Sequence, residues 1–285
     1  MSRPPFIAPP GGVRAYRLET ARGAFAVLDA APEREPRATA LLVPGYTGSK
    51  EDFIALLGPL AEAGYRAVAV DGRGQYETPG PRERHARSAY GLAALAEDVL
   101  AQARALGTGG LHLVGHSFGG LVSRGAVLRA AAARHTPFDS LTLMSSGPGR
   151  IARLQRWRVR ALCGGLPVLG PKAVWRMWHP AEDRSEVGDF LRRRWLAHTH
   201  AQLLAVGRTL RHEPDRVAHL AATGLPVHVL SGERDGAWPV PLLDRMAGRL
   251  GAHRTVVKGA EHSPNAEQPL VTAAVMVDFW AGLGR

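Results

Sequence analysis

The chain has 285 residues, of which 45% are hydrophobic and 21% are charged, and it contains one cysteine, Cys163. This length can bury the core of one large α/β domain with an insertion, and a single cysteine excludes a fold held by internal disulfides. The formal net charge of +11 comes mostly from arginines spread along the whole chain, which favours a generally basic surface and argues against a nucleic-acid partner. The densest basic stretch, residues 150–160, leaves attraction of an anionic substrate or membrane open.

The first residues, MSRPPFIAPPGG, have no apolar run typical of a signal peptide, and no stretch is long enough to span a membrane. We therefore expect an intracellular, cytoplasmic protein without stable membrane insertion. The sequence does not indicate an oligomeric state.

Short apolar runs rich in β-branched residues alternate with helical patterns along the chain. Strands are predicted at 13–18, 24–28, 39–44, 67–70, 111–114, 141–145, 226–230 and 255–257, and helices at about 51–63, 91–106, 118–134, 242–250 and 266–283. This alternation predicts an α/β fold with an eight-stranded, mostly parallel sheet flanked by helices. Between residues 147 and 220 the pattern is helical, so a helical insertion is expected after the sixth strand.

The segment LHLVGHSFGG at residues 111–120 leads from an apolar strand through Gly-x-Ser-x-Gly into a helical pattern. This order predicts a sharp turn at the carboxyl end of the strand, with the hydroxyl of Ser117 above the sheet. The two glycines allow a close backbone approach, and the helix that follows directs its amino end to the same point, where negative charge is favoured. Ser117 is therefore the candidate nucleophile.

The acid that such a serine needs is expected on a loop at the same edge of the sheet, and the chain order Ser, Asp, His is typical of one large enzyme group. Asp235 follows the strand at 226–230 after a small-residue turn and is the predicted acid. Glu233 lies in the turn itself and stays an alternative. Asp215 and Asp244 lie in helical patterns, where a solvated charge is the ordinary interpretation, and Asp139 precedes its strand, at the wrong edge.

The base must be chosen among twelve histidines. His262 lies between the last strand and the last helix, where one ring nitrogen can accept the serine proton while the other donates to Asp235. His116 is expected to pack or hydrogen-bond beside the nucleophile, and His112 is expected to be a buried, satisfied polar group. Solvent-facing positions are predicted for three histidines of the insertion: His198, His200 and His212.

Negative charge on a tetrahedral intermediate requires two hydrogen-bond donors. The backbone N–H of Phe118, directly after the nucleophile, is one candidate. The second is expected from the loop after the third strand, where Gly45 and Gly48 allow close approach and the main chain of Tyr46 is the predicted donor. The phenol of Tyr46 is also a candidate for lining the substrate pocket.

Together these segments resemble the α/β-hydrolase superfamily from about residue 13 to the end of the chain. GHSFGG, SGERDGAWP and GAEHSPNAEQP resemble its nucleophile, acid and histidine segments, and VPGYTGS resembles its oxyanion loop, with Pro-Gly in place of the common His-Gly. VDGRGQYETPG resembles the loop after the fourth strand, which implies that Asp71 and Arg73 brace the floor of the active site. The usual tail of that loop is replaced here by residues 75–77.

The resemblance also implies a domain organisation and excludes two reactions. Lid-bearing relatives carry a helical cap after the sixth strand, so we expect a core over residues 1–146 and 221–285 and a cap over 147–220. Epoxide hydrolases and haloalkane dehalogenases of this fold attack with an aspartate, whereas the position here is Ser117. The sequence has no metal-binding or nucleotide-binding pattern, so we expect neither a metal nor another cofactor.

The expected cap contains four of the six tryptophans: Trp157, Trp175, Trp178 and Trp195. Trp175 and Trp178 are three residues apart and share a helix face. With Tyr46, Phe118 and Trp238 they are candidates for lining an apolar acyl pocket, and attachment of the cap to the core is the equal alternative. The arginines at 192–194 are expected to form a solvated face.

The resemblance implies a serine hydrolase of the esterase or monoglyceride-lipase kind, which cleaves a carboxylic ester of a small to medium, largely apolar substrate. Thioesterases, lactonases and C–C bond hydrolases use the same constellation, and the sequence does not separate them. A ligand-binding or receptor module on the same fold also stays open.

Overall fold

The computed structural model describes residues 1–82, 86–107, 110–179, 181 and 183–284. Within these residues eight strands form one sheet in the order β1-β2-β4-β3-β5-β6-β7-β8. The strands are β1 (Val13–Thr20), β2 (Gly23–Ala30), β3 (Thr39–Val43), β4 (Arg66–Val70), β5 (Leu111–His116), β6 (Ser140–Met144), β7 (Val227–Gly232) and β8 (His253–Val257). β2 pairs antiparallel with β1 and β4, and all other neighbours are parallel. The predicted eight-stranded, mostly parallel sheet is confirmed.

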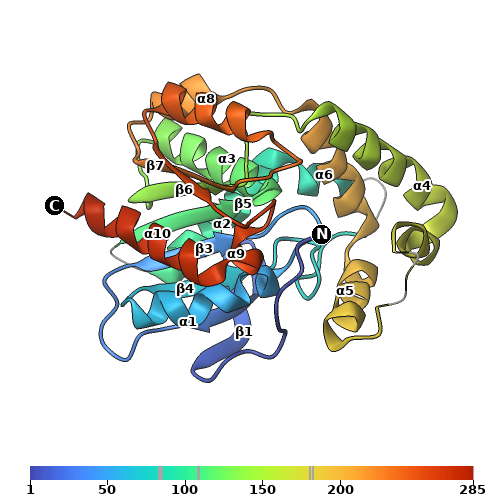
Figure 1. The fold of residues 1–285 in the computed structure, drawn as a ribbon, viewed down its shortest axis with the longest axis horizontal. Helices are drawn as coiled ribbons and strands as arrows, with labels where there is room; N and C mark the ends of the chain where they lie inside the picture. The colour runs from blue at the N-terminus through green and yellow to red at the C-terminus, as the bar shows by residue number, and fades with distance from the viewer. Residues whose placement is uncertain (83–85, 108–109, 180, 182, 285) are drawn as a thin grey trace.

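Helices cover both faces of the sheet (Figure 1). One face packs against α1 (Ile54–Glu62), α9 (Pro264–Glu267) and α10 (Pro269–Leu283), and the other against α2 (Leu92–Leu106), α3 (Phe118–Ala132) and α8 (Val240–Leu250). Strands β3, β5 and β6 are buried along their whole length, as expected for mostly apolar strands with helices on both faces of the sheet. Two short 3₁₀ helices, η1 (Lys50–Phe53) and η2 (Ala86–Tyr90), complete the loops after β3 and β4.

The last helical pattern of the sequence is divided in two, where one helix over 266–283 was predicted. Gln268 has φ −138° and ψ 60° between α9 and α10. The following residue is Pro269, which disfavours the helical conformation of its predecessor and lacks an N–H to continue the helix. The proline therefore starts a new helix.

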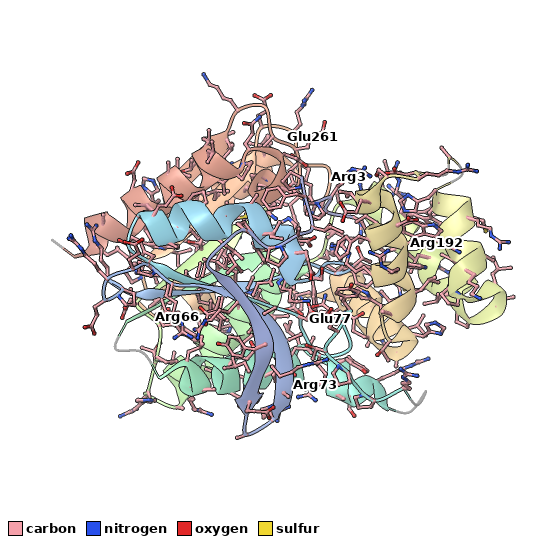
Figure 2. All side chains as sticks on the ribbon, turned by 90° about the horizontal axis from the view of Figure 1, so that it is seen from below. Arg3, Arg66, Arg73, Glu77, Arg192 and Glu261 are labelled. Atoms are coloured by element: carbon pink, nitrogen blue, oxygen red, sulfur yellow. The ribbon has the colours of Figure 1, made fainter. Side chains whose placement is uncertain are left out.

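The described residues between β6 and β7 form four helices: α4 (Arg153–Trp178), which kinks at Gly170, α5 (Glu186–Ala197), α6 (His200–His212) and α7 (Val217–Ala221). α4 and α5 lie to one side of the sheet, with α4 at the outer edge of the molecule (Figure 1). In Figure 2, Arg66 of β4 and Arg192 of α5 lie at opposite sides of the molecule. α7 packs into the core, where its Val217 and Leu220 are buried in the cluster that the sheet forms with α3 and α8. The same cluster includes Ala201, Val206 and Leu210 of α6.

Candidate active site

The turn between β5 and α3 carries Ser117 in an unusual backbone conformation, with φ 54° and ψ −119°. Such a conformation is costly for a residue with a side chain and persists only where its surroundings hold it. The flanking glycines explain how the turn closes. A Cβ on Gly115 would lie 2.5 Å from the carbonyl oxygen of Gly119, and a Cβ on Gly119 would lie 2.2 Å from that of Val43. Only glycine fits at these two positions.

A chain of hydrogen bonds links the three residues predicted as nucleophile, base and acid. Ser117 Oγ lies 3.0 Å from His262 Nε2, and His262 Nδ1 lies 3.0 Å from Asp235 Oδ1. Asp235 is held in turn, because its Oδ1 also accepts from the backbone N–H groups of Ala237 and Trp238 at 2.7 and 3.1 Å. The side chain of Asp235 is fully buried, whereas that of His262 is 33% exposed. The acid is thus fixed, and the histidine faces both the serine and the open site.

His116 holds the backbone of His262 in place. Its Nε2 lies 2.9 Å from the carbonyl oxygen of His262. A carbonyl only accepts, so His116 must donate its Nε2–H. Burial, together with the neighbouring His262, lowers the pKa of His116 to about 3, so this ring stays neutral beside the candidate base. The expected hydrogen-bonding role of His116 is confirmed, and its partner is the loop that carries His262.

Two backbone N–H groups lie beside Ser117 without a protein partner. In the part of the chain that the structure describes, neither the amide of Phe118 nor that of Tyr46 donates a hydrogen bond. Phe118 begins α3, whose first N–H groups have no intrahelical acceptor. The loop that carries Tyr46 closes against the nucleophile, because a Cβ on Gly45 would lie 3.2 Å from Ser117 Cβ. Both amides are therefore available to an oxyanion.

Gln75 fixes this loop, a role that the sequence did not reveal. Its Nε2 donates to the carbonyl of Gly45 at 2.7 Å, and its Oε1 accepts from the N–H of Gly72 at 2.9 Å. The residue is buried. One side chain thereby joins the loop after β3 to the loop after β4. In the sequence, Gln75 stands out only because residues 75–77 replace the usual tail of the loop after the fourth strand.

A buried ionic cluster holds the same two loops together further from Ser117. Asp71 accepts from the backbone N–H of Lys50 at 2.7 Å, and Lys50 Nζ lies 3.3 Å from Asp71 and 2.8 Å from Glu77. Burial alone would lower the pKa of the Lys50 ammonium, but the carboxylates of Asp71, Glu51 and Glu77 raise it above its ordinary value. The bracing role expected for Asp71 agrees with these contacts.

Arg73 braces a different part of the core. Its guanidinium makes two hydrogen bonds of 2.7 Å to Asp98 of α2, and one of 2.8 Å to the carbonyl of Arg22. Figure 2 shows Arg73 and Glu77 beside the first strands of the sheet. Arg73 therefore ties the loop after β4 to α2 and to the β1–β2 turn.

A cavity of about 470 Å³ opens onto Ser117 and His262. Its wall combines the loop after β3, including Tyr46, with apolar side chains of the segment between β6 and β7: Ile151, Val159, Leu162, Val174, Trp175, Trp178 and Trp195. The Tyr46 ring is fixed because its hydroxyl donates to the carbonyl of Leu203 at 2.6 Å. Burial raises the pKa of this phenol well above its ordinary value. Tyr46, Trp175 and Trp178 thus lie where a pocket-lining role was predicted.

Phe118 and Trp238 do not lie on the cavity wall, so their predicted pocket-lining role is wrong. The side chain of Phe118 turns into the core between the sheet and α2, because its backbone already belongs to the first turn of α3. Trp238 is fully buried and donates its indole N–H to the carbonyl of Gly149 at 3.0 Å. Its ring lies against Gly147, where no Cβ would fit. Both aromatic rings therefore belong to the packed core.

Two residues of the insertion were expected in solvent and are buried instead. Arg194 is fully buried, and its Nη1 lies 2.6 Å from Asp52 of η1, which is equally buried. His198 ends α5 with its Nδ1 2.7 Å from the carbonyl of Arg194. Arg194 thereby anchors α5 to η1, and His198 closes the end of α5. His200 and His212 are exposed, as predicted.

Burial lowers the pKa of several histidines in the core. The pKa is about 4 for His112 and His198 and about 3 for His116 and His228. His112 lies 2.9 Å from the hydroxyl of Ser140 through its Nδ1 and stacks on Trp280, so it is the satisfied core histidine that was predicted. We refer to His112, His116, His198 and His228 as the four buried histidines.

The described residues contain no cluster of histidine, cysteine, aspartate or glutamate side chains that could hold a metal ion. Over the same residues, no helix is long and apolar enough to cross a lipid bilayer.

Comparison with known proteins gives one family. A family model described as "Alpha/beta hydrolase family" matches residues 40–275. A putative carbamate hydrolase RutD from Variovorax paradoxus is 32% identical over 158 residues, which are 52% of this chain and 56% of that protein. The chain therefore matches little more than half the length of this curated relative.

Solved structures with the same fold include two esterases. A thermophilic esterase from Thermogutta terrifontis has a TM-score of 0.74 and 21% identity, with 95% of this chain and 99% of that chain covered. The esterase EaEST from Exiguobacterium antarcticum has a TM-score of 0.75 and 17% identity, with 93% and 99% covered. At these identities the likeness shows the shared fold.

Proposed function

The chain belongs to the alpha/beta hydrolase family, and from this premise we propose that it is a serine hydrolase that cleaves a carboxylic ester or a related acyl bond. The observation that carries the proposal is the continuous hydrogen-bond chain from Ser117 Oγ through His262 to Asp235, with 3.0 Å at both steps. This arrangement activates a hydroxyl for attack on a carbonyl carbon.

In the first half of the proposed reaction, Ser117 attacks the carbonyl carbon and His262 Nε2 accepts the hydroxyl proton. The imidazolium that forms is stabilised by the Asp235 carboxylate, whose geometry is fixed by the backbone N–H groups of Ala237 and Trp238. His262 then protonates the leaving alcohol, and an acyl-enzyme remains on Ser117. In the second half, water loses its proton to His262 and attacks the acyl carbon, which releases the acid and restores the serine.

The amides of Tyr46 and Phe118 are proposed to donate to the oxyanion of each tetrahedral intermediate. Support comes from their lack of acceptors within the described protein and from the close approach of Gly45 to Ser117. Preorganised donors of this kind contribute about 2.7–4 kcal/mol each to transition-state stabilisation. The side chains and amides together supply nucleophile, base and oxyanion donors, so the proposed reaction requires no metal or organic cofactor.

We propose that residues 147–220 act as a cap over this site and that the substrate is a small to medium, largely apolar acyl compound. The cavity volume of about 470 Å³ lies within the range of small-molecule sites, about 300–1,000 Å³. Its apolar wall comes mainly from this segment, with Leu162, Val174 and Trp175 from α4. We further propose a cytoplasmic enzyme acting on a small molecule, which cell fractionation would test.

A carbamate is a second candidate substrate, because the curated relative is named a putative carbamate hydrolase. The same nucleophile, base and oxyanion donors would act on a carbamate carbonyl: the alcohol leaves with the proton from His262, and water then releases a carbamic acid from the carbamoyl-enzyme. The two candidate substrates are distinguished by comparing kcat/KM for an ester with kcat/KM for the carbamate that has the same leaving group.

The test is turnover of a graded series of p-nitrophenyl esters by the wild type and by Ser117→Ala. We expect release of p-nitrophenol by the wild type with an optimum at a short or medium acyl chain, and loss of that release in Ser117→Ala. Turnover that survives in Ser117→Ala would contradict the proposal. A carbamate preferred over its matched ester would favour the second candidate.

A further inference from the structure

The outer side of α4 is cationic without compensation. α4 kinks at Gly170, where φ 74° and ψ 166° are not helical. Before the kink it contains four basic residues, Arg153, Arg156, Arg158 and Arg160, and neither aspartate nor glutamate, and Lys172 and Arg176 lie beyond the kink. Over the described part of the chain, Arg153, Arg158 and Arg160 form no ion pair. A run of like charges with no partner repels itself, so an anionic surface would stabilise it.

The same side of α4 exposes large apolar groups. Leu154 is 62% exposed, Trp157 69% and Val168 82%. With Ala161 they follow the spacing i, i+3, i+7 and i+14, which is one face of a helix. Leu162 and Leu166, on the opposite side, are buried. α4 is thus apolar on two sides, only one of which the protein covers.

The charges border the uncovered apolar stripe. At 3.6 residues per turn, Arg158 lies on one flank of the stripe and Arg153 and Arg160 lie on the other. We call Arg153, Leu154, Trp157, Arg158, Arg160, Ala161 and Val168 the outer face of α4. Apolar side chains flanked by arginines are the composition of helices that lie in the interface plane of a membrane.

We propose that the outer face of α4 docks on the surface of an anionic lipid bilayer. The arginines would approach the lipid phosphates while Leu154, Trp157 and Val168 enter the boundary between headgroups and acyl chains. A nucleic acid would satisfy the arginines but leave the apolar stripe in water. A second copy would bring two cationic faces together. The combination of both features favours the lipid surface.

A bilayer docked on the outer face of α4 would also lie near the cavity that opens onto Ser117. Arg158 and Trp178 belong to the cavity wall and are also exposed on α4, with Trp178 44% exposed. Figure 1 shows α4 at the outer edge of the molecule, with no other helix beyond it. A bilayer against the outer face would therefore lie at the rim of the cavity, and an acyl compound dissolved in the lipid could enter it from there.

Docking on the bilayer does not depend on the proposed hydrolysis, so binding is measured with a variant that lacks the candidate nucleophile. Full-length Ser117→Ala is sedimented with vesicles of phosphatidylcholine alone or phosphatidylcholine mixed with phosphatidylglycerol, at low and high salt. We expect binding to the anionic vesicles that weakens as salt screens the arginines, and little binding to the zwitterionic ones.

Variants locate the contact. Each arginine near an anionic surface contributes about fivefold to binding, so Arg153→Gln with Arg160→Gln should weaken it about 25-fold. Trp157→Glu should weaken it at least about tenfold, because it places a carboxylate in the apolar stripe. The matched controls are Arg245→Gln on α8 and Leu270→Glu on α10, both exposed and remote from α4, and they should bind within about twofold of the parent.

The proposal is wrong if the parent protein ignores anionic vesicles or if the α4 variants bind like the controls while keeping the parent's melting temperature. Binding to a short DNA duplex that is unaffected by Trp157→Glu would assign the arginines to nucleic acid instead. Self-association that Trp157→Glu abolishes would make the face an interface between copies. Turnover of a soluble ester by otherwise wild-type chains with the α4 substitutions reports on the proposed reaction separately.

Discussion

Replacement of Gln75 by leucine should damage both the stability and the chemistry of the site. Leucine has a similar volume but no polar atom, so the N–H of Gly72 would lose its partner at 2.9 Å, and the carbonyl of Gly45 would keep only the N–H of Gly48, at 3.2 Å. One unsatisfied group costs about 1–3 kcal/mol, so the free energy of unfolding should fall by about that amount. A displaced loop also moves the amide of Tyr46.

Displacement of the Tyr46 amide should lower kcat. Complete loss of one oxyanion donor costs about 10²–10³-fold in kcat, so we expect kcat to fall about 10–10²-fold for a loop that shifts without unfolding, with a small change in KM. The assay is ester turnover, with urea unfolding measured in parallel. Gln202→Leu is the matched control, because its Nε2 lies 3.4 Å from the carbonyl of Tyr46, and its effect should be smaller. A Gln75→Leu enzyme that loses stability but keeps the wild-type kcat would refute the reasoning.

Three other outcomes are expected. His262→Ala should lose on the order of 10⁴-fold or more in kcat, and near-wild-type turnover would show that another residue is the base. Arg194→Met leaves the carboxylate of Asp52 buried without its partner at 2.6 Å, so the free energy of unfolding should fall by about 3–5 kcal/mol, and Asp52→Leu in the same chain should restore much of it. The four buried histidines have lowered pKa values, so the unfolded chain takes up protons below their ordinary pKa of about 6.5 while the folded chain does not. The free energy of unfolding should therefore be highest above about pH 6.5 and fall by up to about 1.4 kcal/mol per histidine for each pH unit as the pH decreases toward 4. A urea midpoint that stays constant over this pH range would show that these histidines are not buried in the neutral form.

The sheet and the positions of Ser117, Asp235 and His262 could be predicted because local patterns specify them. β3, β5 and β6 are short, mostly apolar runs, and the glycines around Ser117 leave one backbone geometry available. The acid and the histidine follow strands that end at the same edge, so the topology brings them together. Their catalytic roles stay a prediction.

The contacts that sequence reasoning missed are long-range. Arg194 is the last of three consecutive arginines, of which the first two are exposed, and only the approach of η1, 142 residues earlier in the chain, makes it buried. Phe118 and Trp238 are close to the candidate catalytic residues in the sequence, yet their rings point into the core. Gln75 gave no periodic or compositional signal, because its role depends on two loops meeting.

If Ser117 is a nucleophile activated by His262, a fluorophosphonate probe should modify it, and mapping of the modified peptide would locate the label. We expect stoichiometric labelling of the wild type at Ser117, no labelling of Ser117→Ala, and much slower labelling of His262→Ala. A wild-type chain that stays unlabelled, or a label on another residue, would contradict this role of Ser117.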